Sequence, residues 1–330
     1  QYGADALRYF ITTNSSPGQD LRYEEEKVLS SWNFINKLWN ISRYTIMNTK
    51  DVIGKELILE PRKFTFPDRW IITRLNRLID SVDYFFDHYE FGEAAKLIYN
   101  FTWNDFASWY IEMAKLSDTL TTKSVLIYVL ENTIKLLHPF MPFVTEEIFQ
   151  KLSPNSLSIM ISDWPKNNGM LYPDTEEKDW FFELIKGVRT VRNDYQVSWT
   201  KPIDLFIQTD KENMAFLREN DQYIRKFLNP NQLIIAETIE KKDEAISLIF
   251  ANASILIPLG SLVNVTEEIK RLNDQLVNLE KEIERCTKML SNPNFTAKAP
   301  HAKIEEEKNK LQKYEENYKE VTYRLKELTE

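Results

Sequence analysis

The strongest constraint on the fold is a heptad repeat near the C-terminus that occurs twice, with an interruption between the two runs. Apolar residues at alternating three- and four-residue steps form one stripe along a helix, and such a stripe packs against a partner helix. The first run contains Ile269, Leu272, Leu276, Leu279, Ile283, Cys286 and Leu290. The second run contains Leu311, Tyr314, Tyr318, Val321, Leu325 and Leu328. Two helices of similar length are therefore predicted to fold back on one another.

The segment between the two runs predicts the turn of an antiparallel hairpin. Residues 291–300 contain Pro293 and Pro300 and break both registers. At about 1.5 Å per residue, the first run alone spans roughly 33 Å, so this arm can reach a partner away from the body of the protein. Cys286 occupies an apolar heptad position, and we interpret it as a packing residue and not as a reactive thiol.

Composition limits the kinds of site that the chain can build. The 330 residues are 43% hydrophobic, which is enough for the cores of two or three domains. Seven glycines are few, and no G-x-G-x-x-G or G-x-x-x-x-G-K-[ST] motif occurs, so phosphate-cradling loops are not expected. With one cysteine and three histidines, we expect neither a disulfide framework nor a metal site.

Charge and hydropathy restrict partners and location. A formal net charge of −8 argues against nucleic-acid binding through bulk charge, but a local basic face would be sufficient for RNA. No long apolar run predicts a membrane span, and no signal peptide opens the chain. We therefore expect a cytoplasmic protein without a membrane partner.

Residues 92–150 predict the centre of a helical bundle. One helix is indicated by apolar residues at three- and four-residue steps with short detours: Ile98, Phe101, Phe106, Trp109, Met113 and Leu116. A second helix is expected from Val125 to Leu137, followed by a turn at Pro139 and Pro142 and a short helix that begins at Thr145.

Two further helices are predicted upstream of this centre. The first opens with Glu24, Glu25 and Glu26, whose charge suits a helix N-terminus. We expect its buried side to contain Trp32, Ile35, Leu38, Trp39 and Ser42. Other faces carry Asn36, Lys37, Asn40, Arg43 and Tyr44, which meet either solvent or RNA. The second helix begins at residues 67–70, with Asp68 near its cap.

From residue 153 the pattern changes to short apolar runs separated by turns, which predicts a small α+β domain. The apolar runs are residues 157–161, 203–208, 233–236, 246–249 and 254–258. Helical spacing is found between them at residues 180–195 and 213–228. We expect this domain to have an architectural role.

Several motifs resemble class I aminoacyl-tRNA synthetases. The order Trp103, Phe106, Tyr110, Glu112 and Lys115, followed by HPFMPFVTEE at 138–147, resembles the anticodon-binding domain of the valyl, isoleucyl and leucyl group. The motifs SPGQDLR at 16–22, NFINKLW at 33–39 and LSNPNFTAKAP at 290–300 resemble the valyl type within that family. Isoleucyl enzymes often end in a cysteine-bound zinc module, which one cysteine cannot build. The segment VSWTKP at 197–202 departs from the family pattern.

The resemblance implies a mainly α fold with four parts. Residues 1–50 form a stem-contact segment that leads into the first bundle helix, and residues 51–152 form the anticodon-binding helical bundle. Residues 153–262 form the small α+β linker domain. Residues 263–330 form an antiparallel coiled-coil arm that binds tRNA.

The resemblance also implies binding residues for a valine tRNA. The positions matching the anticodon site are Lys37, Asn40, Arg43, Tyr44, Ile111 and Glu112. Glu112 is chemically suited to accept from the N4 amino group of cytosine, although it can instead pair with Lys115 on its own helix. On the arm, Arg285 and Lys310 match basic positions that meet the outer corner of the tRNA, although charges beside a heptad seam usually pair the two helices.

Catalysis is not expected from these residues. The chain opens on Gln1 and lacks the ATP-binding signatures and the editing domain of the family, so we interpret it as a piece of a longer protein. No catalytic or metal-binding residue is proposed. ATP and Mg²⁺ are expected as cofactors of the parent ligase and none is expected for this piece, which we predict to be a monomer that binds valine tRNA without aminoacylating it. The alternatives are an isoleucyl-type anticodon module and a coiled-coil scaffold that dimerises through its heptads.

Overall fold

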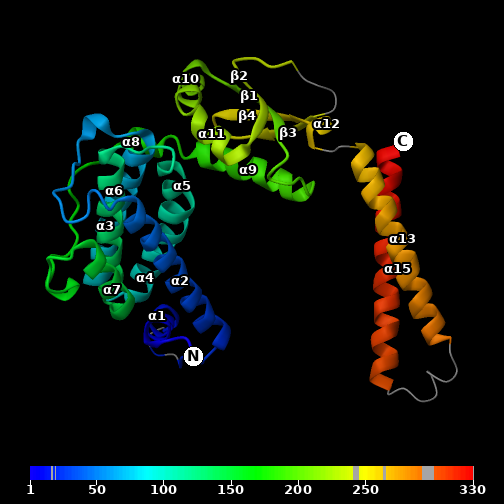
Figure 1. Ribbon diagram of the computed structural model, residues 1–330, viewed down its shortest axis with the longest axis horizontal. Coiled ribbons are helices and arrows are strands. Elements are labelled where there is room, and N and C mark those ends of the chain that lie inside the picture. The colour runs from blue at the N-terminus through cyan, green and yellow to red at the C-terminus, as the bar shows by residue number, and fades with distance from the viewer. Residues whose placement is uncertain (16–17, 19, 241–244, 263–264, 292–300, 330) are drawn as a thin grey trace. The chain divides into compact units, whose positions relative to one another are not determined.

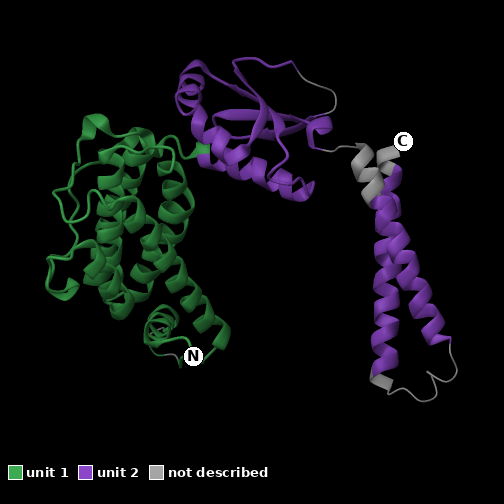
Figure 2. Cartoon of the chain, viewed as in Figure 1, with its two compact units in different colours: residues 1–181 green, residues 182–330 purple. Residues whose placement is uncertain are grey.

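The computed structural model describes residues 1–15, 18, 20–240, 245–262, 265–291 and 301–329, without the side chains of 265–271, 301, 302, 324 and 327–329. The chain forms two compact units, Gln1–Phe181 and Phe182–Glu330 (Figures 1 and 2). The predicted division into four segments is finer than these units and stays a prediction.

The first unit is helical, as predicted. Its elements are α1 (Ala4–Asn14), α2 (Glu25–Asn48), η1 (Pro61–Lys63), α3 (Phe66–Asp87), α4 (Phe91–Asn100), η2 (Phe101–Tyr110), α5 (Ile111–Ala114), α6 (Leu120–Leu137), α7 (Pro142–Leu152), η3 (Ile159–Ile161) and α8 (Pro173–Glu176). Helix α9 (Trp180–Asp194) begins in this unit and continues into the next.

Helix α3 begins as predicted and contains a buried polar centre. Thr65 is its N-cap and forms a capping box with Asp68, which is fully buried. The Asp68 carboxylate also accepts hydrogen bonds from the Tyr110 hydroxyl at 2.6 Å and from the Thr122 hydroxyl at 3.2 Å. One carboxylate thereby connects α3, η2 and α6.

The helix expected around residues 98–116 is not α-helical throughout, because η2 has π-helical turns. A π turn is wider than an α turn, so a buried residue recurs after five positions. The step from Phe101 to Phe106, both buried, has this length. The detours in the apolar spacing therefore have a structural cause.

The buried face of α2 agrees with the prediction at Leu38 and Ser42 and differs from it at the other three positions. Trp32 and Trp39 are each 39% exposed, and Ile35 is only partly buried. The buried residues are Val28, Ser31, Phe34, Leu38, Ile41, Ser42 and Thr45. The ring of Phe34 packs between Tyr9 of α1 and Tyr99 of α4, at 5.4 Å and 4.7 Å between centroids. This contact selects the buried face, and it leaves both tryptophans near the surface.

Two further predictions were wrong beside α7. The helix starts at Pro142 and not at Thr145, because proline fits the first helical turn and the Asp5 carboxylate accepts from the backbone N–H of Val144 at 2.8 Å. The apolar run 157–161 forms no strand. It contains η3, which is held to α7 through a hydrogen bond from Ser158 to Glu146, and Leu157 is 86% exposed.

The second unit contains the predicted small α+β fold. Its sheet has the order β2-β1-β4-β3, formed by β1 (Ile203–Thr209), β2 (Pro230–Ala236), β3 (Ala245–Ile249) and β4 (Ala253–Pro258). β1 and β2 are parallel and the other pairs are antiparallel. The accompanying helices are α10 (Lys211–Glu219), α11 (Asp221–Leu228) and α12 (Leu259–Leu262).

Two long helices, α13 (Val265–Leu290) and α15 (His301–Thr329), pack side by side at the end of the chain (Figure 1). Cys286 contacts Glu307, and the earlier Glu280 contacts the later Tyr318, so the helices run in opposite directions. Leu272 and Cys286 are buried, as their heptad positions predict. The predicted turn at 291–300 lies, apart from Ser291, outside the described residues.

Candidate nucleic-acid interface

Two groups of residues form around side chains that the sequence marked as candidate binding residues. The first, called the bundle face below, consists of Lys37 and Tyr44 on α2, Trp103 on η2, and Glu112 and Lys115 around α5. The second, called the arm cluster, consists of Arg285 on α13 with Glu307 and Lys310 on α15.

The bundle face follows the seam between α2 and the continuous run of α4, η2 and α5. The Lys37 ammonium lies 5.4 Å from the centre of the Trp103 ring, and the Lys115 ammonium lies 5.2 Å from the centre of the Tyr44 ring. The order of these contacts shows that the two helical runs are parallel. Each cation is held by an aromatic face, an interaction worth about 0.5–1 kcal/mol at exposed positions.

Glu112 pairs with Lys115 at 2.6 Å, which is the alternative that the sequence left open. Both side chains remain partly exposed, at 35% and 36%. A pair of this kind stabilises a helix by only about 0.2–0.5 kcal/mol, so a ligand can replace it. Burial, and then the negative charge of Glu112, raise the pKa of Tyr44, so its hydroxyl is a hydrogen-bond donor at neutral pH.

The remaining predicted anticodon residues are less closely grouped. Asn40 and Arg43 are exposed on α2. Arg43 precedes Tyr44 directly and thus points about 100° around the helix from it. Ile111 is only 4% exposed, so its side chain packs beneath the bundle face. The structure therefore brings Tyr44 and Glu112 together through Lys115, and Lys37 lies about two turns away along α2 beside Trp103. The binding roles of all six residues stay predictions.

Sequence reasoning did not include Trp103 or Lys115 among the binding residues. Both were visible as members of a motif, but their contacts with α2 join residues about 65 to 70 positions apart. No local pattern contains that information.

A cavity of about 470 Å³ continues the same seam towards the start of α2. Two lysines and two tyrosines contribute to its lining, which consists of Tyr9, Thr13, Asn14, Lys27, Ser30, Ser31, Lys96, Tyr99 and Asn100. Ser30, Lys37 and Tyr44 are spaced by seven residues, so the cavity and the bundle face lie along one stripe of α2. Lys27 and Lys96 pair with the exposed carboxylates of Glu24 and Glu93, at 2.8 and 2.7 Å.

The arm cluster contains a buried carboxylate between two cations. The side chain of Glu307 is 7% exposed, and its oxygens lie 3.0 Å from the Lys310 ammonium and 3.8 Å from the Arg285 guanidinium. Arg285 also pairs with Glu282, and Lys310 with Glu306. Hydrogen bonding to Lys310 lowers the pKa of Glu307, and pairing with Glu306 and Glu307 raises that of Lys310. All three groups are therefore charged at neutral pH.

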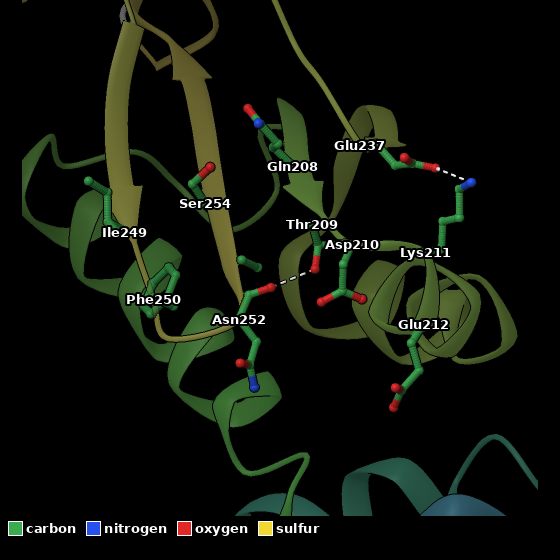
Figure 3. Close-up of a pocket in the computed structure, with 11 residues that line it drawn as sticks. Gln208, Thr209, Asp210, Lys211, Glu212, Glu237, Ile249, Phe250, Asn252 and Ser254 are labelled. Carbon is green, nitrogen blue, oxygen red and sulfur yellow. Dashed lines mark hydrogen bonds and ion pairs between the residues drawn. The ribbon is translucent and has the colours of Figure 1, made fainter.

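Another pocket lies in the second unit beside the end of β1 (Figure 3). The Thr209 hydroxyl donates to the backbone carbonyl of Asn252 at 2.5 Å, and Lys211 lies 3.8 Å from Glu237 at the pocket wall. Its lining contains more carboxylates than cations, which does not suit RNA.

The described part of the chain contains no group of three or more histidine, cysteine, aspartate or glutamate side chains that could hold a metal ion. No helix within that part combines the length and apolarity required to cross a bilayer.

Two known protein families match segments of the chain that include Trp103, Glu112 and Lys115 of the bundle face and all of the arm cluster. Residues 68–207 match the family described as the anticodon-binding domain of tRNA ligase, and residues 264–329 match the valyl tRNA synthetase tRNA binding arm. The chain is 46% identical to a valine–tRNA ligase of Geobacillus stearothermophilus and 44% identical to that of Bacillus subtilis (strain 168), in each case over 99% of its own length. It spans 38% of the length of these relatives.

Among solved structures, the chain resembles a leucyl enzyme in the crystal structure of the ternary complex of Agrobacterium radiobacter K84 agnB2 LeuRS-tRNA-LeuAMS, with a TM-score of 0.42 and 17% identity. That match covers 73% of this chain and 30% of the other. The two family matches and the identity to valine–tRNA ligases along nearly its whole length show that the chain belongs to the valyl-tRNA synthetase family, as a C-terminal part of those proteins.

Proposed function

We propose that this chain is the tRNA-binding portion of a valine–tRNA ligase. The bundle face contacts the anticodon of a valine tRNA, and the arm, as an antiparallel coiled coil, contacts the outer corner of the same molecule. The observation that carries the proposal is the bundle face, where Lys115 contacts both Tyr44 of α2 and Glu112. Glu112 and Lys115 lie within residues 68–207, which match an anticodon-binding domain.

The chemistry of the bundle face suits single-stranded RNA. Unstacked bases of a loop stack on aromatic rings and form hydrogen bonds through their edges. The half-buried Tyr44 ring is a stacking surface, and the Glu112 carboxylate is an acceptor for an exocyclic amino group. Lys37 and Lys115 supply positive charge for the phosphates on either side of such a base.

Aminoacylation is a proposal for the longer protein. There, valine would be joined to tRNA with ATP and Mg²⁺. Among its described residues, this chain has no group of three or more histidine, cysteine, aspartate or glutamate side chains that could hold a metal ion. We derive no catalytic step from it, and we expect the purified chain to be a monomer that shows no ATP–pyrophosphate exchange.

Binding to three tRNAs tests the proposal: valine tRNA, a copy with a swapped anticodon, and isoleucine tRNA, each followed by fluorescence anisotropy at two salt concentrations. We expect preference for the valine anticodon and a weaker preference in Glu112→Ala. Glu183→Ala is the matched control, because Glu183 forms the same kind of pair with Lys186 at 2.9 Å on α9. Preference for isoleucine tRNA would favour an isoleucyl-type module. Equal weak binding to all three tRNAs, together with dimerisation, would favour a coiled-coil scaffold.

A further inference from the structure

Among the described side chains of the arm, Glu307 is a buried charge at the seam between the two helices. Glu307 faces Cys286 across the seam, with 3.6 Å between the cysteine sulfur and a carboxylate oxygen. A carboxylate that is removed from water is unfavourable unless cations and hydrogen-bond donors compensate it. An apolar residue would suit this position better if packing were its only role.

The two compensating cations come from different helices and remain accessible. Arg285 on α13 is 47% exposed and Lys310 on α15 is 42% exposed, and both lie within 4 Å of the Glu307 carboxylate. Each also contacts a second, more exposed carboxylate: Glu282 is 43% exposed and Glu306 is 60% exposed. The exposed carboxylates can rotate into water and release their cation to a phosphate, whereas Glu307 is confined by the seam.

From this difference we infer that Glu307 is a positioning residue for RNA binding by the arm. It holds Arg285 and Lys310 as a fixed pair across the two helices, and the pair binds the phosphate backbone. The inference rests on the proposed function, because it requires the arm to bind tRNA. It assigns opposite effects to two neighbouring glutamates that contact the same lysine.

Glu307→Gln and Glu306→Gln separate positioning from charge, since each makes the arm more positive by one. Without Glu307, Arg285 keeps only Glu282 and Lys310 keeps only Glu306 among these partners, so the two cations are no longer held as one pair. We therefore expect weaker binding of valine tRNA and a salt dependence reduced by about one to two counterions. Loss of Glu306 removes a competitor of the phosphate, so we expect an affinity increase of about twofold with an unchanged salt slope. Equal effects of the two variants would overturn the inference.

Cys286, the only cysteine of the chain, reports whether the seam stays closed. The reaction of Cys286 with a thiol reagent should remain slow in Glu307→Gln. Measuring the rate over a range of pH separates the accessibility of the thiol from the fraction that is present as thiolate. If Glu307→Gln opens the seam, Glu307→Asp is used in its place. The shorter aspartate side chain keeps the negative charge but moves the carboxylate away from Arg285. A protected thiol with an unchanged salt slope in that variant would overturn the inference. Failure of the unaltered chain to bind tRNA would instead contradict the proposed function.

Discussion

The bundle face and the arm cluster hold their cations in different ways. On the bundle face, Lys37 and Lys115 lie over aromatic rings, and Lys115 also pairs with Glu112. In the arm, Arg285 and Lys310 form ion pairs with carboxylates, and Arg285 also donates to the Cys286 sulfur at 3.6 Å. A ring attracts a cation without neutralising it, while a carboxylate competes with phosphate for the same charge. The bundle face is thus suited to splayed bases, and the arm to a salt-sensitive backbone contact.

The supports of the two regions differ as well. The bundle face lies over a deep core in which Phe34, Trp70 and Ile71 are at most 1% exposed. Along the arm, the buried side chains in the described part are Leu272, Cys286 and Glu307. Substitutions in the bundle should therefore affect folding most, and substitutions in the arm should affect charge-dependent binding.

The largest effect is expected from Asp68→Ala in the bundle. It leaves the Tyr110 and Thr122 hydroxyls without their buried acceptor, which should cost about 2 to 5 kcal/mol of unfolding free energy. Asp80 lies on the same helix, α3, and its exposed carboxylate accepts a hydrogen bond from Asn167. Asp80→Ala should therefore cost at most about 0.5 kcal/mol of unfolding free energy. Urea denaturation compares the two. Equal stability of both variants would show that the bundle does not depend on this centre.

Tyr44→Ala should weaken binding of valine tRNA by about 1–3 kcal/mol, the contribution of one base stacked on an aromatic ring. Tyr44→Phe keeps the ring and should retain most of the affinity. Tyr84→Ala is the control, since Tyr84 is a 57% exposed tyrosine of α3 that stacks on His88. Anisotropy titrations measure all three variants, and the bundle face would lose its proposed role if Tyr44→Ala and Tyr84→Ala behaved alike.

Lys310→Ala should reduce the salt slope of tRNA binding by about one, because one phosphate contact releases one counterion. Lys288→Ala is the control, because Lys288 is an exposed lysine of the same arm that pairs with Glu284, four residues away. It should leave the salt slope of tRNA binding nearly unchanged. Titrations over a series of salt concentrations give both slopes. An unchanged slope in Lys310→Ala would remove the contrast between arm and bundle.

The smallest effect concerns acid stability of the bundle. Burial lowers the pKa of His138 below its ordinary value. As the pH falls from 7 towards 5, the unfolded chain therefore binds a proton at this histidine before the folded chain does. The free energy of unfolding decreases over this range, and the contribution of His138 to stability is complete only above it. His138→Gln should make thermal melting of the bundle less dependent on pH within this range. A pH dependence identical to that of the unaltered chain would exclude His138 as its source.

Patterns that repeat along one helix could be predicted from the sequence. The heptads located the two arm helices, and the capping sequence located the start of α3. The buried face of α2 was predicted correctly at Leu38 and Ser42 and incorrectly at Trp32 and Trp39, because two apolar stripes compete along this helix. Packing of Phe34 against Tyr9 and Tyr99 decides between them, and those partners lie on other helices.

The same limit applies to the candidate site. Lys37, Tyr44 and Glu112 could be selected by resemblance, but their alignment with Trp103 and Lys115 depends on how α2 packs beside η2 and α5. Ile111 could not be recognised as buried from its neighbours in sequence, because the wide turns of η2 shift the register of the residues that follow. Contacts between helices require the fold.

The most direct test of whether the two regions contact two separate parts of one tRNA is hydroxyl-radical footprinting. Valine tRNA is footprinted when bound to the unaltered chain, to Tyr44→Ala and to Lys310→Ala. We predict protection of the anticodon loop and of the outer corner by the unaltered chain. Tyr44→Ala should lose only the loop protection, and Lys310→Ala should weaken only the corner protection. Loss of both protections in either variant, or no protection of the loop by the unaltered chain, would contradict the assignment.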